Sequence, residues 1–303
     1  MKKWLKVALI VVAVVLVVAV GGVFIMMRPQ GIGLVRHPIE EREPLEETLD
    51  EHGVSYEEVA VTTEDGLNLV GWYIPSQNGA TVIVQHGYKG DRGDLVVTAV
   101  LLQRHGYGVL LSTLRAHDQS DGDLITFGKE EMKDFEAWYQ YLLTRDDVDP
   151  DKIGILGESM GGALSIQYAA QNENIKAVVA HSAFAKFADT VNKGVALQTG
   201  LPAFPFAPMI LFWAEREAGV DTSKIDATQW ITEISPRAVL ILQGGADDHI
   251  SVDSGQMLYD AAGEPKELWF EPEAAHHGLE EEPFEAEFER RVVGFFDQYL
   301  LEP

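Results

Sequence analysis

The fold is decided by the stretch Lys152-Ile-Gly-Ile-Leu-Gly-Glu-Ser-Met-Gly-Gly-Ala-Leu-Ser-Ile-Gln-Tyr-Ala-Ala170. It opens as a short apolar strand, and from Met160 onward it reads as the start of a helix. Between them, Gly157-Glu-Ser-Met-Gly161 fits G-x-S-x-G, a pattern that places a serine on a sharp turn between strand and helix. Glycines at both ends leave space where strand and helix crowd together. The stretch therefore predicts that Ser159 presents its hydroxyl at the carboxyl end of a sheet, as a candidate nucleophile.

Apolar runs typical of buried strands alternate with helical segments on both sides of this turn. Strands are expected at residues 58–63 and 67–74, as a hairpin, and at 80–85, 108–112, 152–156, 177–180, 238–242 and 267–270. Helices are expected at about 93–105, 129–144, 160–171, 254–262 and 283–301. This alternation predicts an α/β fold, a mostly parallel, doubly wound sheet of about eight strands with helices on both faces. Residues 184–234 interrupt the alternation and read as an inserted helical cap.

The loop after the strand at 80–85 reads His86-Gly-Tyr-Lys-Gly90. In folds with a nucleophile turn of this kind, an oxyanion is held by the backbone N–H after the serine and by an N–H from this earlier loop. We therefore expect the amides of Met160 and Tyr88 to form the oxyanion hole. His86, at a strand end directly before a glycine, is expected to support the loop rather than to act in catalysis.

A catalytic acid and base are expected later in the chain, each on a loop that leaves the carboxyl end of a strand. The strand at 238–242 runs into Gly244-Gly-Ala-Asp-Asp-His249, which offers Asp247 and, as the alternative, Asp248. The strand at 267–270 is followed by His276 and His277, of which one is expected to be the base, with His276 preferred. Neighbouring side chains diverge and no cysteine joins them, so no metal and no cofactor are expected.

With these residues placed, the chain resembles the α/β-hydrolase superfamily, specifically bacterial membrane-anchored serine aminopeptidase-like and Bem46-like esterases. The resemblance covers about residues 56–300 and rests on the motifs at 86–88, 115–122, 157–161, 245–248 and 272–276. It implies a Ser159, His276, Asp247 triad with oxyanion donors at Tyr88 and Met160. Relatives usually carry Asp-x-Arg-Gly-His-Gly-x-Ser where this chain has Thr113-Leu-Arg-Ala-His-Asp-Gln-Ser120, so an acid and two glycines are replaced.

The N-terminus carries an uncharged run, Val7 to Met27, whose 21 residues would span about 30 Å of hydrocarbon as a helix. An uncleaved transmembrane anchor at residues 1–27 is preferred over a signal peptide, because the run is long and lacks a clear cleavage site. Residues 28–54 read as a linker and 55–303 as the hydrolase domain. Lysines precede the span, which places the catalytic domain outside the cytoplasm of a single-pass membrane protein.

The strongly acidic charge of the chain restricts the kinds of molecule that it can bind. With 48 acidic and 23 basic residues, the net charge of −25 argues against nucleic acid and against anionic headgroups. The expected partners are a small acyl substrate and the membrane, with the oligomeric state left open. The expected function is hydrolysis of carboxylic ester-type bonds through an acyl-enzyme. A peptidase or thioesterase on the same triad and a catalytically silent tethered scaffold are the alternatives.

Apolar side chains of the cap, from Phe204 to Trp213, provide the only indication of substrate. They either pack the cap on the main domain, or line an acyl pocket or face the membrane.

Overall fold

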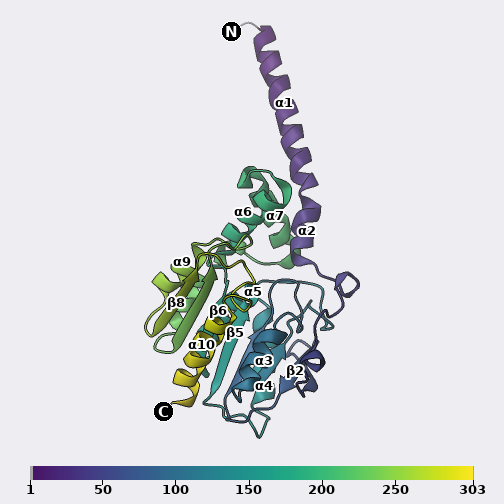
Figure 1. Cartoon of the computed structure of the whole chain (residues 1–303). Coiled ribbons are helices and arrows are strands. Elements are labelled where there is room, and N and C mark those ends of the chain that lie inside the picture. Colours follow the sequence, from purple (N-terminus) through teal and green to yellow (C-terminus); the bar gives the residue numbers. More distant parts are fainter. Residues whose placement is uncertain (1–2, 303) are drawn as a thin grey trace.

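The protein has three visible parts in a computed structural model that describes residues 3–302: a long N-terminal helical rod, a helical cap beside it, and an α/β body (Figure 1). The body is built on one eight-stranded sheet in the order β1-β2-β4-β3-β5-β6-β7-β8. β1 and β4 each pair with β2 in antiparallel fashion, and the other neighbours are parallel. The strands are β1 (Glu57–Thr62), β2 (Asn68–Ile74), β3 (Thr81–Gln85), β4 (Gly108–Ser112), β5 (Ile153–Glu158), β6 (Ile175–His181), β7 (Ala238–Gly244) and β8 (Lys266–Glu271).

Helices cover both faces of this sheet, because successive side chains of the buried strands point to opposite faces. One face packs against α4, α5 and α9, and the other against α3 and α10. The predicted α/β-hydrolase fold class, with a mostly parallel sheet and helices on both faces, is confirmed. The helices of the body are α3 (Val96–Arg104), α4 (Glu131–Leu142), α5 (Met160–Gln171), α8 (Ala227–Trp230), α9 (Ser254–Ala261) and α10 (Glu285–Phe296), which continues as a π-helical turn over Asp297–Leu301.

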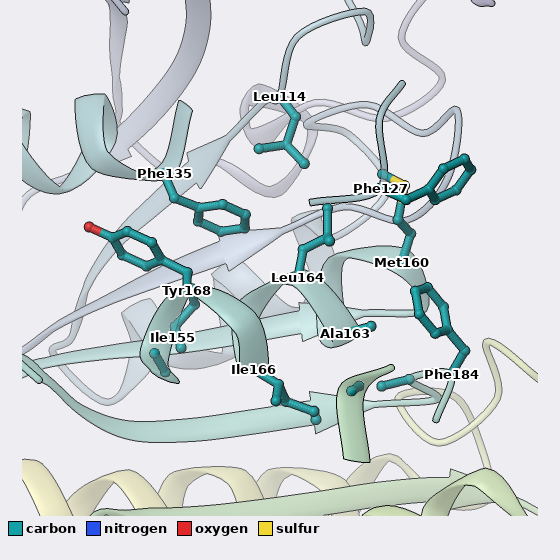
Figure 2. Packing of buried hydrophobic residues seen from close by; sticks show 14 of the residues in the cluster. Leu114, Phe127, Phe135, Ile155, Met160, Ala163, Leu164, Ile166, Tyr168 and Phe184 are labelled. Atoms are coloured by element: carbon teal, nitrogen blue, oxygen red, sulfur yellow. The ribbon is translucent and has the colours of Figure 1, made fainter. Parts of the chain in front are cut away.

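The helix that follows Ser159 is fixed by apolar packing along its length. The rings of Phe135 on α4 and Tyr168 on α5 stack with centroids 5.2 Å apart. At the N-terminal end of α5, Figure 2 shows the Met160 side chain in the same apolar cluster as Phe127 and Phe184. This packing holds the first turn of α5, and with it the backbone beside Ser159, in place.

The rod consists of α1 (Lys3–Met26) and α2 (Arg28–Val35), which follow one another with helical backbone at Met27. Together they form one helix long and apolar enough to cross a membrane, with a mean hydropathy of 3.2 in its most apolar window. Where the sequence suggested a linker from residue 28 onward, the first eight residues are helical, and Gly31 and Val35 among them are buried. A Cβ on Gly31 would lie 2.5 Å from the carbonyl oxygen of Ile210, so α2 lies directly against the cap.

The cap is formed by α6 (Phe187–Thr199) and α7 (Ala203–Ala218), followed by short helical turns at Thr222–Lys224 and Ile231–Glu233. Its apolar residues divide into two groups. Phe206, Ile210 and Leu211 belong to an apolar cluster that also holds residues of α2, of α6 and of the body, and the contacts of α7 are with α2 and α6. Phe204 and Phe212 are exposed and do not contribute to that packing.

Candidate active site

Ser159 lies on a strained turn between β5 and α5. Its φ of 54° and ψ of −119° fall in a region that L-residues other than glycine rarely adopt. The Ser159 amide donates to the carbonyl of His181 at the end of β6, with an N···O distance of 2.8 Å. A Cβ on Gly161 would lie 2.3 Å from the carbonyl oxygen of His86, so only glycine fits beside the turn. The structure thus has the strained strand-turn-helix that the G-x-S-x-G pattern predicts.

His276 and Asp247 meet on the loops after β8 and β7. The His276 Nδ1 atom lies 2.7 Å from the Asp247 Oδ2 atom, and both side chains are buried. The other carboxylate oxygen of Asp247 accepts from the backbone amides of His249 and Ile250, at 2.9 and 2.8 Å. Burial alone would raise the pKa of Asp247, but these hydrogen bonds hold it below its usual value. Asp247 is therefore a carboxylate, oriented to fix the His276 ring.

The two alternative residues lie elsewhere. Asp248 is exposed and pairs with the ring of its neighbour His249, so it does not reach His276. His277 pairs instead with the buried carboxylate of Glu158, the residue before the nucleophile. That hydrogen bond raises the pKa of His277 to about 9, which makes it a cation at neutral pH. An imidazole that is already protonated at neutral pH is a poor proton acceptor, and the contact with Asp247 favours His276 over His277 as the base.

The backbones of Ser159 and His276 both bind to the end of β6, through its neighbouring residues His181 and Ser182. The Ser182 hydroxyl, next to the carbonyl that binds the Ser159 amide, donates to the carbonyl of His276 at 2.9 Å. Within residues 3–302, no hydrogen bond joins the Ser159 hydroxyl to the His276 ring. Such contacts are often long in substrate-free enzymes and tighten when the substrate binds.

The loop after β3 lies beside the nucleophile. A Cβ on Gly87 would lie 3.4 Å from the Ser159 Cβ and 3.9 Å from its Oγ. His86 shapes this loop: its Nδ1 contacts the Gly87 carbonyl at 2.8 Å, and its Nε2 accepts from the Leu114 amide at 3.2 Å. Burial lowers the pKa of His86, so it is a neutral ring with one donor and one acceptor, as a supporting role requires.

The side chains of this loop turn away from Ser159 and bind the end of α2. The Tyr88 hydroxyl donates to the Leu34 carbonyl at 2.9 Å, and the Lys89 ammonium donates to the Gly33 carbonyl at 3.1 Å. The last carbonyls of a helix have no partner within the helix and attract cations and donors. The loop expected to hold the oxyanion is thus attached to the rod, and only the backbone of Tyr88 is left for that role.

The divergent segment 113–120 keeps a glycine-like backbone without glycine. Ala116 has a φ of 61° and Asp118 a φ of 49°, at the two positions where relatives usually have glycine. Buried ion pairs brace the segment: Arg115 donates to Asp134 at 2.7 Å, and the side chains of Arg92 and Asp118 approach to 3.0 Å. Ala116 and Asp118 therefore hold backbone angles that cost them strain and that glycine would adopt freely.

Some residues that support the site were not found from sequence. Lys193 on α6 donates to the carbonyls of Asp247 and Ile250, at 2.8 and 2.6 Å. The ring of His249 stacks on His276 with centroids 4.9 Å apart. No pattern in the sequence links a lysine of the cap to the loop after β7, because 54 residues separate the partners.

Among residues 3–302, two groups of three side chains have ligand atoms within 4.8 Å of one another, namely Glu158, His181 and Glu280, and Asp247, Asp248 and His249. In the first group, Glu158 already pairs with His277, and burial raises the pKa of Glu280 toward the neutral acid. In the second, Asp247 holds His276 and two backbone amides. In both groups a carboxylate is thus already used within the site, and the absence of a metal and of a cofactor stays a prediction.

Together, the sheet order, the strained serine turn and the histidine–carboxylate pair define an α/β hydrolase. Residues 125–302 match the sequence profile of the prolyl oligopeptidase family, and the chain belongs to that family. A membership of this kind establishes a hydrolase of the esterase and peptidase type; it does not fix the bond that is cleaved.

Similar proteins include one uncharacterized protein and two that are described as hydrolases. The uncharacterized protein Rv2307c of Mycobacterium tuberculosis is 29% identical over 90% of this chain and 89% of its own length. The thiohydrolase aneE of Aspergillus aculeatus is 28% identical over 44% of this chain and 43% of its own length. The esterase Pf2001 of Pyrococcus furiosus has a similar structure, with a TM-score of 0.73 and 25% identity over 88% of this chain and 98% of that one.

Proposed function

We propose that this protein is a membrane-anchored serine hydrolase that cleaves carboxylic ester bonds with Ser159 as nucleophile, His276 as general base and Asp247 as the residue that orients it. The observation that carries the proposal is the 2.7 Å contact between His276 and Asp247 on the loops after the last two strands, in the same framework as the strained Ser159 turn. Similarity to the esterase Pf2001 favours ester bonds.

In the proposed mechanism, His276 Nε2 takes the Ser159 proton while Oγ attacks the acyl carbonyl carbon. The resulting oxyanion is held by the backbone amides of Met160 and Tyr88. His276 then gives its proton to the leaving alkoxide, and an ester between Ser159 and the acyl group remains. Water, deprotonated by the same ring, attacks that ester, and the acid departs as the proton returns to Ser159. Asp247 stabilises the imidazolium in both steps.

Burst kinetics test this proposal directly. The full chain in detergent micelles should release p-nitrophenol from p-nitrophenyl butyrate in a burst that matches the enzyme concentration, followed by slower turnover. Ser159→Ala should abolish the burst, and His277→Gln, the matched control on the neighbouring ring, should keep it. A burst that survives in Ser159→Ala would exclude Ser159 as the nucleophile. A folded wild-type chain with no turnover at all would favour the silent scaffold.

Thioesterase activity is the second candidate, because the relative aneE is described as a thiohydrolase. The same chain should be assayed with acyl esters, the matching thioesters and the matching p-nitroanilides. A kcat/KM that is highest for the ester supports the main proposal, whereas a highest value for the thioester or the anilide replaces it with thioesterase or peptidase activity.

The location is part of the proposal. The rod is long and apolar enough to span a bilayer. Lys2, Lys3 and Lys6 precede its uncharged run and outnumber Arg28 and Arg36, which follow it, and this favours a catalytic domain outside the cytoplasm. Since the chain has no cysteine, Leu143→Cys gives a single thiol at an exposed site of the body. It should react with a membrane-impermeant maleimide in intact cells; reaction only after lysis would reverse the orientation.

A further inference from the structure

The tip of the cap is a long surface segment without any charge. In a chain with 23% charged residues, the 21 residues from Gly194 to Ala214 contain no Asp, Glu, Lys, Arg or His. This segment, called here the cap tip, covers the end of α6, the connection and most of α7. Four of its large apolar side chains are exposed, with 79% exposure at Phe204 and 55% at Leu197, and Leu201 and Phe212 also accessible. Apolar side chains exposed together in one segment typically mark a contact surface.

The contacts of α7 show which way the cap tip points. Along the rod, Phe24 contacts Phe212 and Trp213, and farther on Arg36 pairs with Glu217 at 2.5 Å. From Phe24 to Arg36 along the rod, the contacting residues on α7 advance from Phe212 to Glu217. The two helices therefore run in the same direction. The part of α7 that precedes Phe212 therefore extends beside the lower part of α1, as Figure 1 shows for the α6–α7 connection.

The junction between α1 and α7 has the residues of a membrane interface. The Trp213 Nε1 donates to the Phe24 carbonyl at 2.9 Å, and the Arg28 guanidinium lies 5.6 Å from the Trp213 ring centroid. Tryptophan is enriched where a span leaves the hydrocarbon, and tryptophan and arginine both act as interfacial anchors of a span. The eight helical residues from Pro205 to Phe212 rise about 10 Å, which carries the tip from this boundary to the side of the C-terminal part of α1.

We propose that the cap tip penetrates the bilayer that α1 crosses, with Leu197, Leu201, Phe204 and Phe212 among the lipid acyl chains. This inference rests on the proposed membrane anchor. The driving force is burial of apolar surface, because the tip has no cation to attract headgroups and the chain as a whole has a net charge of −25. The tip is fixed to the site from two sides, through Lys193 to the Asp247 loop and through α2 to Tyr88. Penetration therefore holds the candidate active site against the membrane surface.

Depth-dependent quenching in nanodiscs tests the proposal on the full chain in the Ser159→Ala background, so that no catalysis is required. Because the chain lacks cysteine, Phe204→Cys gives a single attachment point for an NBD fluorophore. Val15→Cys in the middle of α1 is the positive reference, and Leu143→Cys after α4, at the opposite edge of the sheet, is the aqueous control. Leu197→Cys replaces Phe204→Cys if that variant does not fold.

Nanodiscs that contain phosphatidylcholine with a doxyl group in the acyl chain should quench NBD at residues 204 and 15 by about twofold or more, as expected inside the hydrocarbon, and leave residue 143 unchanged. Quenching at 15 alone would keep the anchor and overturn penetration of the cap tip. Blue-shifted but unquenched emission at 204 would assign the tip to a second copy of the chain and also overturn the proposal. Quenching at neither 15 nor 204 would overturn the anchor and the penetration together.

Discussion

The Nδ1 atom of His276 lies 2.7 Å from the Oδ2 atom of Asp247, on the loops after two neighbouring parallel strands. This contact fixes the tautomer of the ring and leaves Nε2 free to accept a proton. Asp247→Asn should therefore lower kcat by about 10⁴-fold, because the amide stabilises the wrong tautomer and cannot stabilise an imidazolium. Steady-state ester hydrolysis measures this. The control is Asp248→Asn, at an exposed carboxylate that does not contact His276, and it should stay close to wild type. Comparable losses in both variants would contradict the assignment.

The pair between His277 and Glu158 predicts a pH-dependent stability. Its folded pKa of about 9 lies above the ordinary value of 6.5, so the stabilisation is complete below pH 6.5 and is lost as pH rises through 9. Because the His277 side chain is 59% exposed, screening by solvent reduces the expected loss to about 1 kcal/mol.

Thermal unfolding of the full chain in detergent between pH 6 and 10, for wild type and His277→Gln, measures this loss as a difference between the two proteins. The unfolding free energy of the variant should lack the decline between pH 6.5 and 9. Parallel curves for the two proteins would show that His277 carries no stabilising charge.

The Tyr88 side chain is expected to act on the rod and not on the chemistry. Tyr88→Phe removes the hydrogen bond to the Leu34 carbonyl, which should lower the unfolding free energy by about 1 kcal/mol. The backbone N–H that is proposed to bind the oxyanion remains, so kcat should stay within about threefold of wild type. A 100-fold loss of kcat, an amount typical of a removed oxyanion donor, would place the phenol itself in the reaction.

Lys193 is expected to be a positioning residue for the acid loop. Lys193→Met removes two hydrogen bonds to the carbonyls of Asp247 and Ile250, and we expect kcat to fall by about tenfold because the carboxylate loses its fixed orientation. In the Asp247→Asn background the same substitution should have little further effect, because the two residues act through one interaction. Lys186→Met, at the start of the same helix, is the matched control. Fully additive losses would show that Lys193 acts by another route.

Local patterns in the sequence predicted the sheet, the position of Ser159 and the loops that carry Asp247 and His276. They could do so because strand periodicity, the glycine pattern and the chain order of a hydrolase are all readable along the chain. The sequence preferred His276 to His277 but left both open, because the choice depends on which ring meets Glu158 in space. The contacts of Tyr88 with α2 and of Lys193 with the Asp247 loop were missed for the same reason.

The segment 113–120 shows a different limit. The sequence revealed that two glycines are missing, but only the structure shows that Ala116 and Asp118 still adopt positive φ angles. Buried ion pairs, such as Arg115 with Asp134, hold the backbone in a conformation that the residues themselves disfavour. Residue type alone left the shape of this loop open, because tertiary contacts decide which backbone angles Ala116 and Asp118 adopt.

The central claim, an activated Ser159, is tested most directly by covalent labelling. The full chain in detergent should be treated with a fluorophosphonate, beside Ser159→Ala, and the adduct located by peptide mass spectrometry. We expect stoichiometric phosphonylation of Ser159, loss of labelling in Ser159→Ala, and labelling of His276→Ala that is slower by about 10³-fold or more. An adduct on another residue, or a folded wild-type chain that takes up no label, would contradict the account.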